Sequence, residues 1–476
     1  MNTETNDRKT KIVCTIGPAS ESPRVLEEMI QAGMDVARLN FSHGTHEDHL
    51  RKIATLRHLS DRLKQPVTIL QDLAGPKIRI GKVKEGGAEL RRGDIFLLSI
   101  RDFLGDERGV SVTYPPLPKE VKPGDTILLS DGTIELQVLK STDQDVECRV
   151  MVGGVLTSHK GINFPTGKIL AAAFTEKDRD DLRFGVQNGV DLVSLSYVRS
   201  GRDIEQAKKF LKEAAKQIPV IAKIERKEAL ESIDEILSAA DGVMVARGDL
   251  GVETPLERIP NVQKMLIRKA NALGKPVITA TQMLRSMVDH TRPTRAEVTD
   301  VVNAIYDGTD AVMLSEETAT GRFPIDSVRM MAKISRAAEE QFPFDQFLKA
   351  APDGKRDLPH AISNAAVFLA EEVKAVAIVT PTESGSTARW VSRLRPRQSV
   401  LALSRHLSTV RSLNLCWGVR PVLVPNWTDT DQMLEESKRI AKELGMASPG
   451  DRIIVIAGVP ISIPGTTNLI KVEIVE

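Results

Sequence analysis

Short apolar runs with polar ends recur along much of the chain, and most are followed by a helical pattern. Continuous apolar runs of this length are typical of parallel strands buried on both faces. We expect eight such strands, at residues 11–17, 36–42, 66–72, 191–198, 219–225, 242–249, 276–282 and 311–317. Alternating strands and helices in this number predict a (β/α)8 TIM barrel, whose active site lies where the strands end.

The helix after the first strand shows how local the pattern is. Ser22 can cap it, Pro23 fits its first turn and Gly33 ends it. The ends of the expected strands are polar, and a barrel that served structure alone would not need such groups to converge. They are Asn40, Ser42, Asp72, Ser196, Lys223, Glu225, Arg247, Asp249, Thr281, Ser315 and Glu316.

Two regions depart from the barrel pattern. Residues 76–170 interrupt it after the third strand, are rich in glycine and proline, and contain the hairpin signal Asp131–Gly132. We expect a small all-β domain there, a β-barrel lid. Residues 341–359 resemble a linker, and strands at 375–380, 399–404, 420–424, 451–457 and 468–474 follow. The predicted domains are therefore a barrel at 1–75 and 171–345, the lid at 76–170 and an open α/β domain at 346–476.

Composition narrows the kinds of partner. The 65 basic residues nearly balance the 64 acidic ones, so neither nucleic acid nor a membrane surface is expected. Three widely spaced cysteines fit neither a disulfide framework nor a zinc site. The polar start of the chain lacks the apolar segment of a signal peptide, and we expect a soluble, cytoplasmic protein.

Lys223 and Glu225 lie two apart on one expected strand, so their side chains point to the same face. An ammonium beside a carboxylate at a barrel mouth suits phosphoryl transfer assisted by a divalent cation. A structural ion pair is an equally good interpretation of these two residues alone. Asp249, at the end of the next strand, could complete a magnesium site with Glu225, because Mg²⁺ takes one or two protein carboxylates.

The remaining strand ends offer groups for an anionic substrate. Arg38 could grip a phosphate bidentately, or could simply pair with a neighbouring acid. We expect a tight turn through Gly251, whose exposed backbone N–H groups could bind a carboxylate, although Asp249 could merely cap that turn. Thr281 could contact a substrate carboxylate or relay a proton, or could simply be a β-branched strand residue.

Seven motifs, in order and spacing, resemble the pyruvate kinase family over nearly the whole chain. They are RLNFSHG, DLAGPKIR, IAKIERKEAL, VARGDLGVE, ITATQML, RPTRAEVTDV and DGTDAVMLSEETATGRFP. The resemblance implies transfer of a phosphoryl group from phosphoenolpyruvate to ADP, giving pyruvate and ATP through a Mg²⁺-stabilised enolate (Mn²⁺ being an alternative metal). It also implies a homotetramer and the final step of glycolysis.

The same resemblance assigns roles to residues. Lys223 lies beside the transferring phosphoryl group, Arg38 holds the substrate phosphate, and Thr281 lies near the donor of the enolate proton. Glu225 and Asp249 match the magnesium ligands, and the backbone of Arg247, Gly248 and Asp249 would bind the substrate carboxylate. On the nucleotide side the matching residues are Arg79 and Lys160. The lid would close over the site and exclude water, with hinges at Gly75–Pro76 and near Gly167.

One departure from well-known members concerns potassium. Many members carry an acidic residue where this chain has Lys77, and Thr and Lys where it has Leu73 and Ala74. Asn40, Ser42 and Asp72 match potassium ligands of the family and are retained, with Leu73 completing the pocket. We expect the Lys77 ammonium to serve this pocket, so that K⁺ is not required.

The C-terminal domain carries a Ser/Thr-rich turn before a helix, a pattern typical of phosphate nests and also of ordinary helix caps. By resemblance, this loop holds the phosphate of an allosteric effector through Thr382, Ser384, Gly385, Ser386 and Thr387. The second loop of that site, at 458–468, contains no arginine or lysine. We therefore expect a sugar monophosphate or AMP rather than a bisphosphate.

Two other functions deserve comparison. A metal-dependent lyase or aldolase acting on pyruvate or oxaloacetate would also use Arg, Glu, Asp and Mg²⁺, but would not need the lid, Lys223 or Arg79. A metabolite-sensing paralogue without activity would be expected to have lost Lys223 or a metal carboxylate, and both are intact.

Overall fold

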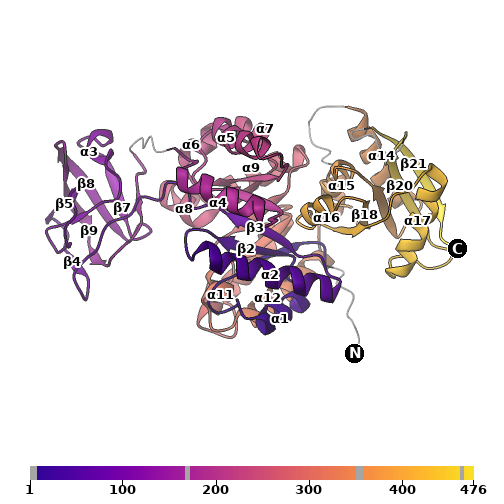
Figure 1. Cartoon of the computed structure of the whole chain (residues 1–476), viewed down its shortest axis with the longest axis horizontal. Helices are drawn as coiled ribbons and strands as arrows, with labels where there is room; N and C mark the ends of the chain where they lie inside the picture. The colour runs from indigo at the N-terminus through magenta and orange to yellow at the C-terminus, as the bar shows by residue number, and fades with distance from the viewer. Residues whose placement is uncertain (1–7, 167–171, 350–356, 461–465) are drawn as a thin grey trace.

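The computed structural model describes residues 8–166, 172–349, 357–460 and 466–476. Three parts follow one another along its longest axis, with the inserted domain at one end, the barrel in the middle and the C-terminal domain at the other end (Figure 1). In the described parts of the chain, no helix combines the length and the apolar character needed to cross a membrane.

The central part is a closed barrel of eight parallel strands, as the sequence predicts. Their order around the barrel is β1-β16-β15-β14-β13-β12-β3-β2, so each strand lies beside its neighbours in the chain. Each of the eight expected runs contains one of these strands. They are β1 (Lys11–Thr15), β2 (Val36–Asn40), β3 (Thr68–Asp72), β12 (Leu192–Leu195), β13 (Val220–Ile224), β14 (Gly242–Ala246), β15 (Val277–Ala280) and β16 (Ala311–Leu314).

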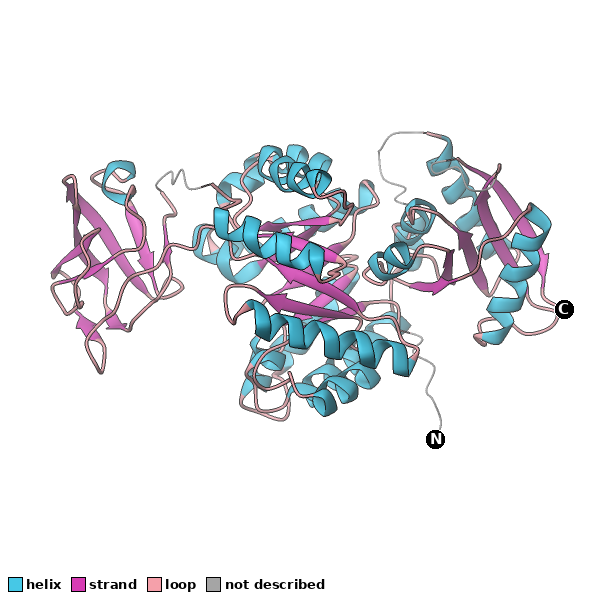
Figure 2. Ribbon diagram, viewed as in Figure 1, coloured by secondary structure: helices cyan, strands magenta, loops and turns pink. Residues whose placement is uncertain are grey.

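Helices cover the outside of the barrel (Figure 2). In α1 (Pro23–Ala32), the Ser22 hydroxyl accepts a hydrogen bond from the Val25 amide, and Gly33 ends the helix at a φ of 116°. Leu26, Met29 and Ile30 form its buried face, so the local prediction for this helix is confirmed. The other helices of the barrel are α2 (His46–Leu63), α4 (Glu176–Gln187), α5 (Gly201–Glu213), α6 (Lys227–Glu231), α7 (Ile233–Ala239), α8 (Arg247–Glu253), α9 (Ile259–Ala272), α10 (Arg295–Tyr306), α11 (Glu316–Ala319) and α12 (Pro324–Glu340).

The inserted domain lies between β3 and α4, where the sequence placed it, and its strands are arranged in two sheets. They form a six-stranded sheet in the order β11-β7-β8-β9-β5-β6 and a two-stranded ladder of β10 with β4. Residues 78–81 lie between the edge strands β11 and β6 and bond to both: the Ile80 amide donates to the Lys160 carbonyl, and the Gly81 amide donates to the Ser111 carbonyl. The Ile162 amide also donates to the Ile78 carbonyl, and the Thr113 amide donates to the Arg79 carbonyl, so this segment joins the two edges of the sheet. A short helix, α3 (Leu117–Glu120), precedes β7 in this otherwise β domain, so the predicted all-β insertion is confirmed.

The strands of the inserted domain confirm the predicted hairpin, because β7 and β8 pair antiparallel on either side of Asp131–Gly132. The bounds are β4 (Ala88–Leu90), β5 (Ile95–Ser99), β6 (Gly109–Ser111), β7 (Thr126–Leu129), β8 (Ile134–Ser141), β9 (Asp145–Val152), β10 (Gly154–Leu156) and β11 (Ile162–Asn163).

The C-terminal domain is an open α/β sheet, also as predicted. Its strand order is β19-β18-β17-β20-β21, with β21 antiparallel to β20. The strands are β17 (Ala377–Pro381), β18 (Ser399–Ser404), β19 (Val419–Leu423), β20 (Arg452–Gly458) and β21 (Thr467–Ile474). The helices are α14 (Leu358–Glu372), α15 (Ser386–Ser392), α16 (Leu407–Leu413) and α17 (Thr430–Glu443).

The stretch predicted as a linker instead contains a helix, α13 (Phe344–Lys349), which spans the expected boundary at 345–346. This segment is helical and packed because its aromatic side chains are buried. The ring of buried Phe342 lies 5.0 Å from that of Phe347 and 5.5 Å from that of Trp417, so this segment packs on the C-terminal domain. The residues at which the three domains begin and end stay a prediction.

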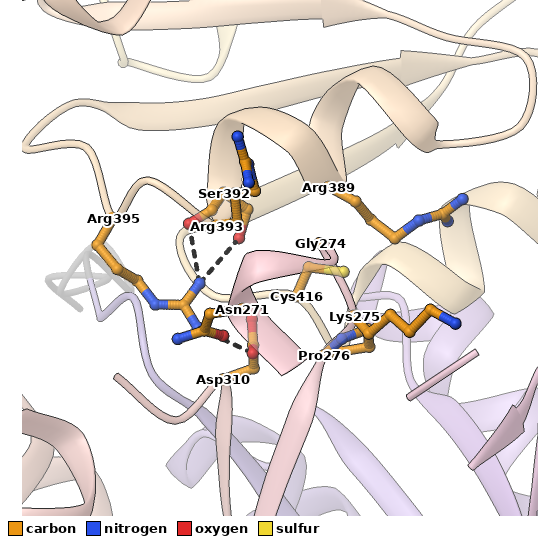
Figure 3. Close-up of a pocket in the computed structure, with 10 residues that line it drawn as sticks. All are labelled: Asn271, Gly274, Lys275, Pro276, Asp310, Arg389, Ser392, Arg393, Arg395 and Cys416. Atoms are coloured by element: carbon orange, nitrogen blue, oxygen red, sulfur yellow. Dashed lines mark hydrogen bonds and ion pairs between the residues drawn. The ribbon is translucent and has the colours of Figure 1, made fainter. Parts of the chain in front are cut away.

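A buried ion pair joins the barrel to the C-terminal domain. Arg395 is 1% exposed, and its guanidinium lies 2.9 Å from the Asp310 carboxylate and donates to the Gly308 carbonyl and the Asn271 side chain (Figure 3). The Asp310 carboxylate also accepts a hydrogen bond from the Trp417 amide. Such a pair is costly to break, because one charge would be left buried and uncompensated.

Candidate active site

Lys223 is the centre of a polar cluster at the carboxyl ends of the barrel strands. Its ammonium lies 2.9 Å from a Glu225 carboxylate oxygen and 3.4 Å from Asp72, and it donates a 2.8 Å hydrogen bond to the Ser196 hydroxyl. Burial lowers the pKa of Lys223, but Asp72 and Glu225 raise it by more, so the net pKa is raised. Lys223 therefore stays protonated. Its side chain lies on the same face as that of Glu225, as the period of the strand predicts.

Arg38 and Asp72 form a second ion pair beside Lys223. The guanidinium lies 2.5 Å from Asp72 and also donates to the Thr15 hydroxyl at 2.8 Å. Burial raises the pKa of Asp72, but Lys223 and Arg38 lower it by more, so the net pKa is lowered. From the sequence, Arg38 could either bind a phosphate or pair with a neighbouring acid. It does pair with an acid, Asp72, and this ion pair holds the arginine at the barrel mouth.

Asp249 differs from the other carboxylates of the site because its side chain has no hydrogen bond or ion pair to any residue that the structure describes. Burial, and then the negative charge of Glu225, raise its pKa to about 6. The second Glu225 oxygen accepts a hydrogen bond from the Tyr197 amide at 2.8 Å. Two carboxylates that repel each other, one of them unpartnered, are a donor set that suits a divalent cation. No group of three or more His, Cys, Asp or Glu side chains that could hold a metal occurs in the described chain.

The segment after β14 is a helix, α8, rather than the tight turn expected from the sequence. Its first turn is fixed from the side by β15: the Gly248 amide donates a 2.7 Å hydrogen bond to the Thr281 hydroxyl. The Arg247 side chain points away from the cluster, where it pairs with Asp300 at 2.7 Å and donates to the Thr281 carbonyl at 2.8 Å. Thr281 has a φ of 71°, a conformation rare for β-branched residues, which these contacts hold in place.

The residues of the expected monovalent-cation pocket are only partly brought together. The Asn40 side chain accepts a hydrogen bond from the Ser42 amide at 3.1 Å, and the Leu73 carbonyl accepts one from Ser196 at 2.7 Å. Lys77 is exposed, and its ammonium makes no hydrogen bond or ion pair to Asp72 or any other described residue. Its positive charge nevertheless partly opposes the rise in the pKa of Asp249.

Arg79, near the start of the inserted domain, and Lys160, near its end, lie on segments that pair with each other. Arg79 donates to the His159 carbonyl at 3.0 Å, and the Lys160 carbonyl accepts a hydrogen bond from the Ile80 amide at 2.9 Å. The predicted hinge residue Gly75 has a φ of 63°, and a Cβ there would lie 2.9 Å from the Tyr197 ring. Only glycine fits this approach. The other predicted hinge, near Gly167, lies outside the described residues.

The five residues of the expected effector loop lie at the start of α15. The Gly385 amide donates to the Thr382 hydroxyl at 3.0 Å, and the Thr387 and Thr467 hydroxyls lie 2.8 Å apart. Ser384 donates to Ser386 at 3.2 Å. The second loop of that site is described only in part, because residues 461–465 lie outside the described residues.

Sequence reasoning missed several supporting residues. Ser194 donates a 2.6 Å hydrogen bond to Asp72, and Thr15 contacts Arg38. Buried Glu317 accepts hydrogen bonds from the Leu284 and Ser315 amides. Period-two spacing could have found Ser194, since it lies two residues before Ser196 in the same expected strand, 191–198. Nothing in the sequence singles out Thr15 or Glu317.

A TIM barrel with a buried lysine, an arginine and two metal-type carboxylates at the ends of its strands defines an enzyme that acts on an anionic substrate. Comparison with known proteins narrows this class. Residues 7–328 match the family model described as "Pyruvate kinase, barrel domain", and residues 360–473 match "Pyruvate kinase, alpha/beta domain".

Individual relatives are also pyruvate kinases. The chain is 48% identical to pyruvate kinase 2 of Synechocystis sp. over 480 residues, which cover all of this chain and 81% of the relative. It is 43% identical to a pyruvate kinase of Clostridium acetobutylicum, with 98% of this chain and all of the relative covered. The crystal structure of a pyruvate kinase from Cryptosporidium parvum superposes with a TM-score of 0.93 at 36% identity, covering 100% of this chain and 98% of that one.

The chain therefore belongs to the pyruvate kinase family. It is an enzyme that transfers a phosphoryl group between phosphoenolpyruvate and ADP, with pyruvate and ATP as products. Enzymes of this family need a divalent metal ion such as Mg²⁺, which the Glu225–Asp249 donor set suits.

Proposed function

We propose that Lys223 and Arg38 are the cations that act on the phosphoryl group during transfer. The observation that carries this assignment is the position of Lys223, whose buried ammonium is held by Glu225 at 2.9 Å and stays charged. Arg38 is oriented by Asp72 and Thr15, so both cations are already in place before substrate arrives. Preorganised charge of this kind stabilises a transition state without reorganisation at the moment of reaction.

Glu225 and Asp249 would hold the divalent cation, which, when bound, supplies positive charge to the oxygens of the substrate phosphate. The unpartnered Asp249 carboxylate supports this role. The raised pKa of Asp249 also predicts that protons compete with the metal at and below about pH 6.

The first turn of α8, from Arg247 to Asp249, would bind the substrate carboxylate through backbone amides. Thr281 bridges this turn and the end of β15. Its hydroxyl would pass a proton to the enolate of pyruvate. Arg79 and Lys160 would contact the nucleotide from the inserted domain, which would act as a lid hinged at Gly75.

We further propose that the enzyme does not require K⁺. Lys77 is exposed on the segment that leads into the lid, and its charge is felt by Asp249. Lid closure would carry its ammonium toward Asn40, Ser42, Asp72 and Leu73, where it would replace the charge of a monovalent cation.

We also propose how the enzyme is regulated, how it assembles and where it works. A sugar monophosphate or AMP would activate the enzyme from the loop formed by Thr382, Ser384, Gly385, Ser386 and Thr387, whose side chains and backbone amides surround the start of α15. We also infer a homotetramer that works in the cytoplasm, on the basis of the family.

Metal binding tests the assignment of the carboxylates without relying on activity. Electron paramagnetic resonance of free Mn²⁺ during a titration should give one strong site in the unaltered protein. Glu225→Gln and Asp249→Asn should each weaken it by about tenfold or more, whereas exposed Asp289→Asn should not. Unchanged Mn²⁺ affinity in both site variants would refute the assignment.

A further inference from the structure

Tyr197 lies just beyond the end of β12, and its backbone has an unusual conformation. Its φ is 56°, in the left-handed region that residues other than glycine rarely adopt. Such a conformation persists only where the surrounding contacts hold it, and it is most common at functional sites. The strain at Tyr197 therefore points to a functional constraint at this position.

The Tyr197 amide is one of two groups that orient the Glu225 carboxylate. It donates a 2.8 Å hydrogen bond to one carboxylate oxygen, and the other oxygen lies 2.9 Å from the Lys223 ammonium. No further hydrogen bond or ion pair to a described residue holds this carboxylate, which is 2% exposed. The preceding residue, Ser196, accepts a 2.8 Å hydrogen bond from Lys223. The two consecutive residues 196 and 197 thus hold Lys223 and Glu225 side by side.

Two contacts fix the ring of Tyr197. Gly75 lies against it, because a Cβ at this glycine would be 2.9 Å from the ring carbon Cδ2. The guanidinium of Arg226 lies 5.5 Å from the ring centroid, a distance at which a cation is attracted to an aromatic face. Arg226 is 5% exposed, and its Nε and Nη1 atoms are buried without a hydrogen-bond partner among the described residues. The ring is therefore tied to the residue that directly follows Glu225.

The hydroxyl group of Tyr197 takes no part in these contacts. It makes no hydrogen bond to any residue that the structure describes. Burial, and then the negative charges of Glu225 and Asp249, raise the pKa of this hydroxyl, so it stays neutral. The aromatic ring, rather than the hydroxyl, is the part of the side chain that holds the backbone in place.

We propose that Tyr197 is a positioning residue of the metal site. Its ring keeps the backbone in the left-handed conformation, and the amide that this conformation presents holds Glu225 in the orientation that binds the divalent cation. This inference rests on the proposed function, in which Glu225 and Asp249 are the metal ligands. Tyr197 acts through Glu225, so its replacement should change the affinity for the metal more than the reaction rate at saturating metal.

Electron paramagnetic resonance of free Mn²⁺ tests this role on the full-length protein. Tyr197→Ala should weaken Mn²⁺ binding about tenfold, which is the size of effect expected when a group that supports a metal ligand is lost. Tyr197→Phe keeps the ring and should bind Mn²⁺ within about twofold of the unaltered protein. The matched control is Phe210→Ala on α5, a half-buried ring with the Arg183 guanidinium 5.6 Å from its centroid, which should leave Mn²⁺ affinity unchanged.

Activation by Mg²⁺ gives a second readout that a merely structural role would not change. Tyr197→Ala should need about tenfold more Mg²⁺ for half-maximal activity, whereas its kcat at saturating Mg²⁺ should stay within about threefold of the unaltered value. If the thermal midpoint shows that Tyr197→Ala is unfolded, Tyr197→Leu is measured in its place. Leucine fills the space beside Gly75 but cannot attract the Arg226 guanidinium, so Mn²⁺ binding should again be weaker.

The proposal is overturned if a folded Tyr197→Ala or Tyr197→Leu protein binds Mn²⁺ as tightly as the unaltered chain, or if Tyr197→Phe binds it as weakly as Tyr197→Ala. Glu225→Gln in the same titration separates two kinds of failure. Unchanged binding in Tyr197→Ala beside weakened binding in Glu225→Gln contradicts the positioning role alone. Unchanged binding in Glu225→Gln contradicts the assignment of the metal ligand, and the inference about Tyr197 with it.

Discussion

The Thr281 hydroxyl accepts a 2.7 Å hydrogen bond from the Gly248 amide and donates one of 2.6 Å to the Ala280 carbonyl. One side chain thus fixes the first turn of α8 against the end of β15, at the place where we propose that the substrate carboxylate binds. Arg247 supports the same arrangement by donating to the Thr281 carbonyl.

Replacing Thr281 therefore tests a role in positioning and in proton transfer together. Thr281→Val keeps the shape and removes the hydroxyl, and should lower kcat about 100-fold. Thr281→Ser should retain most of the activity. Exchange of the pyruvate methyl protons with deuterated water, followed by NMR, isolates the proton step. Wild-type exchange in Thr281→Val would show that the hydroxyl takes no part in it.

The raised pKa of Asp249 makes a prediction about stability. A carboxyl whose pKa is higher in the folded chain than the ordinary value of 3.8 stabilises the fold below about pH 4, and this contribution is lost as the pH rises through about 6. Asp249→Asn imitates the protonated form. In EDTA at pH 8 it should raise the thermal midpoint by about 2–4 °C, with no gain at pH 4.

Exposed Asp289→Asn is the control for that experiment and should leave the midpoint unchanged at both pH values. The stabilised Asp249→Asn protein should also lose activity, because a metal ligand is removed. A midpoint that falls at pH 8 would mean that the carboxylate is paired in the metal-free chain, contrary to the structure.

Some features of the fold and of the site could be predicted from the sequence, and others could not. The strands, and the common face of Lys223 and Glu225, follow from period-two alternation and buried apolar runs, which are local properties. Other features depend on partners far away in the chain. The Arg247 side chain pairs with Asp300, and the helix in the predicted linker packs near Trp417. The helix at 247–253, where a turn was expected, is likewise not a local property of the sequence. The pairing of residues 78–81 with both edges of the sheet in the inserted domain is equally long-range.

The buried Arg395–Asp310 pair should be essential for attachment of the C-terminal domain. Arg395→Met leaves Asp310 buried without its cation and should destabilise the protein by about 3–5 kcal/mol. Urea unfolding followed by tryptophan fluorescence reports on this junction, because Trp417 lies in it. Exposed Arg397→Met should change stability by less than about 1 kcal/mol. Equal effects of the two variants would contradict the account of the junction.

Independence from potassium is a separate prediction. Activity with Na⁺ or tetramethylammonium as the monovalent cation should be within about twofold of that with K⁺, because a fixed ammonium would supply the same charge. Lys77→Glu should make activity depend on K⁺, whereas exposed Lys82→Glu on the same segment should not. A strict K⁺ requirement in the unaltered enzyme would refute the role of Lys77.

The central claim is that the Lys223 ammonium stabilises the transferring phosphoryl group. The most direct test is the rate of ATP formation from phosphoenolpyruvate and ADP in Lys223→Met, beside the matched control Lys227→Met, an exposed lysine at the start of α6. We predict that kcat falls about 100- to 1000-fold in Lys223→Met while pyruvate proton exchange partly survives, and that Lys227→Met keeps full activity. A fully active Lys223→Met enzyme would contradict the account.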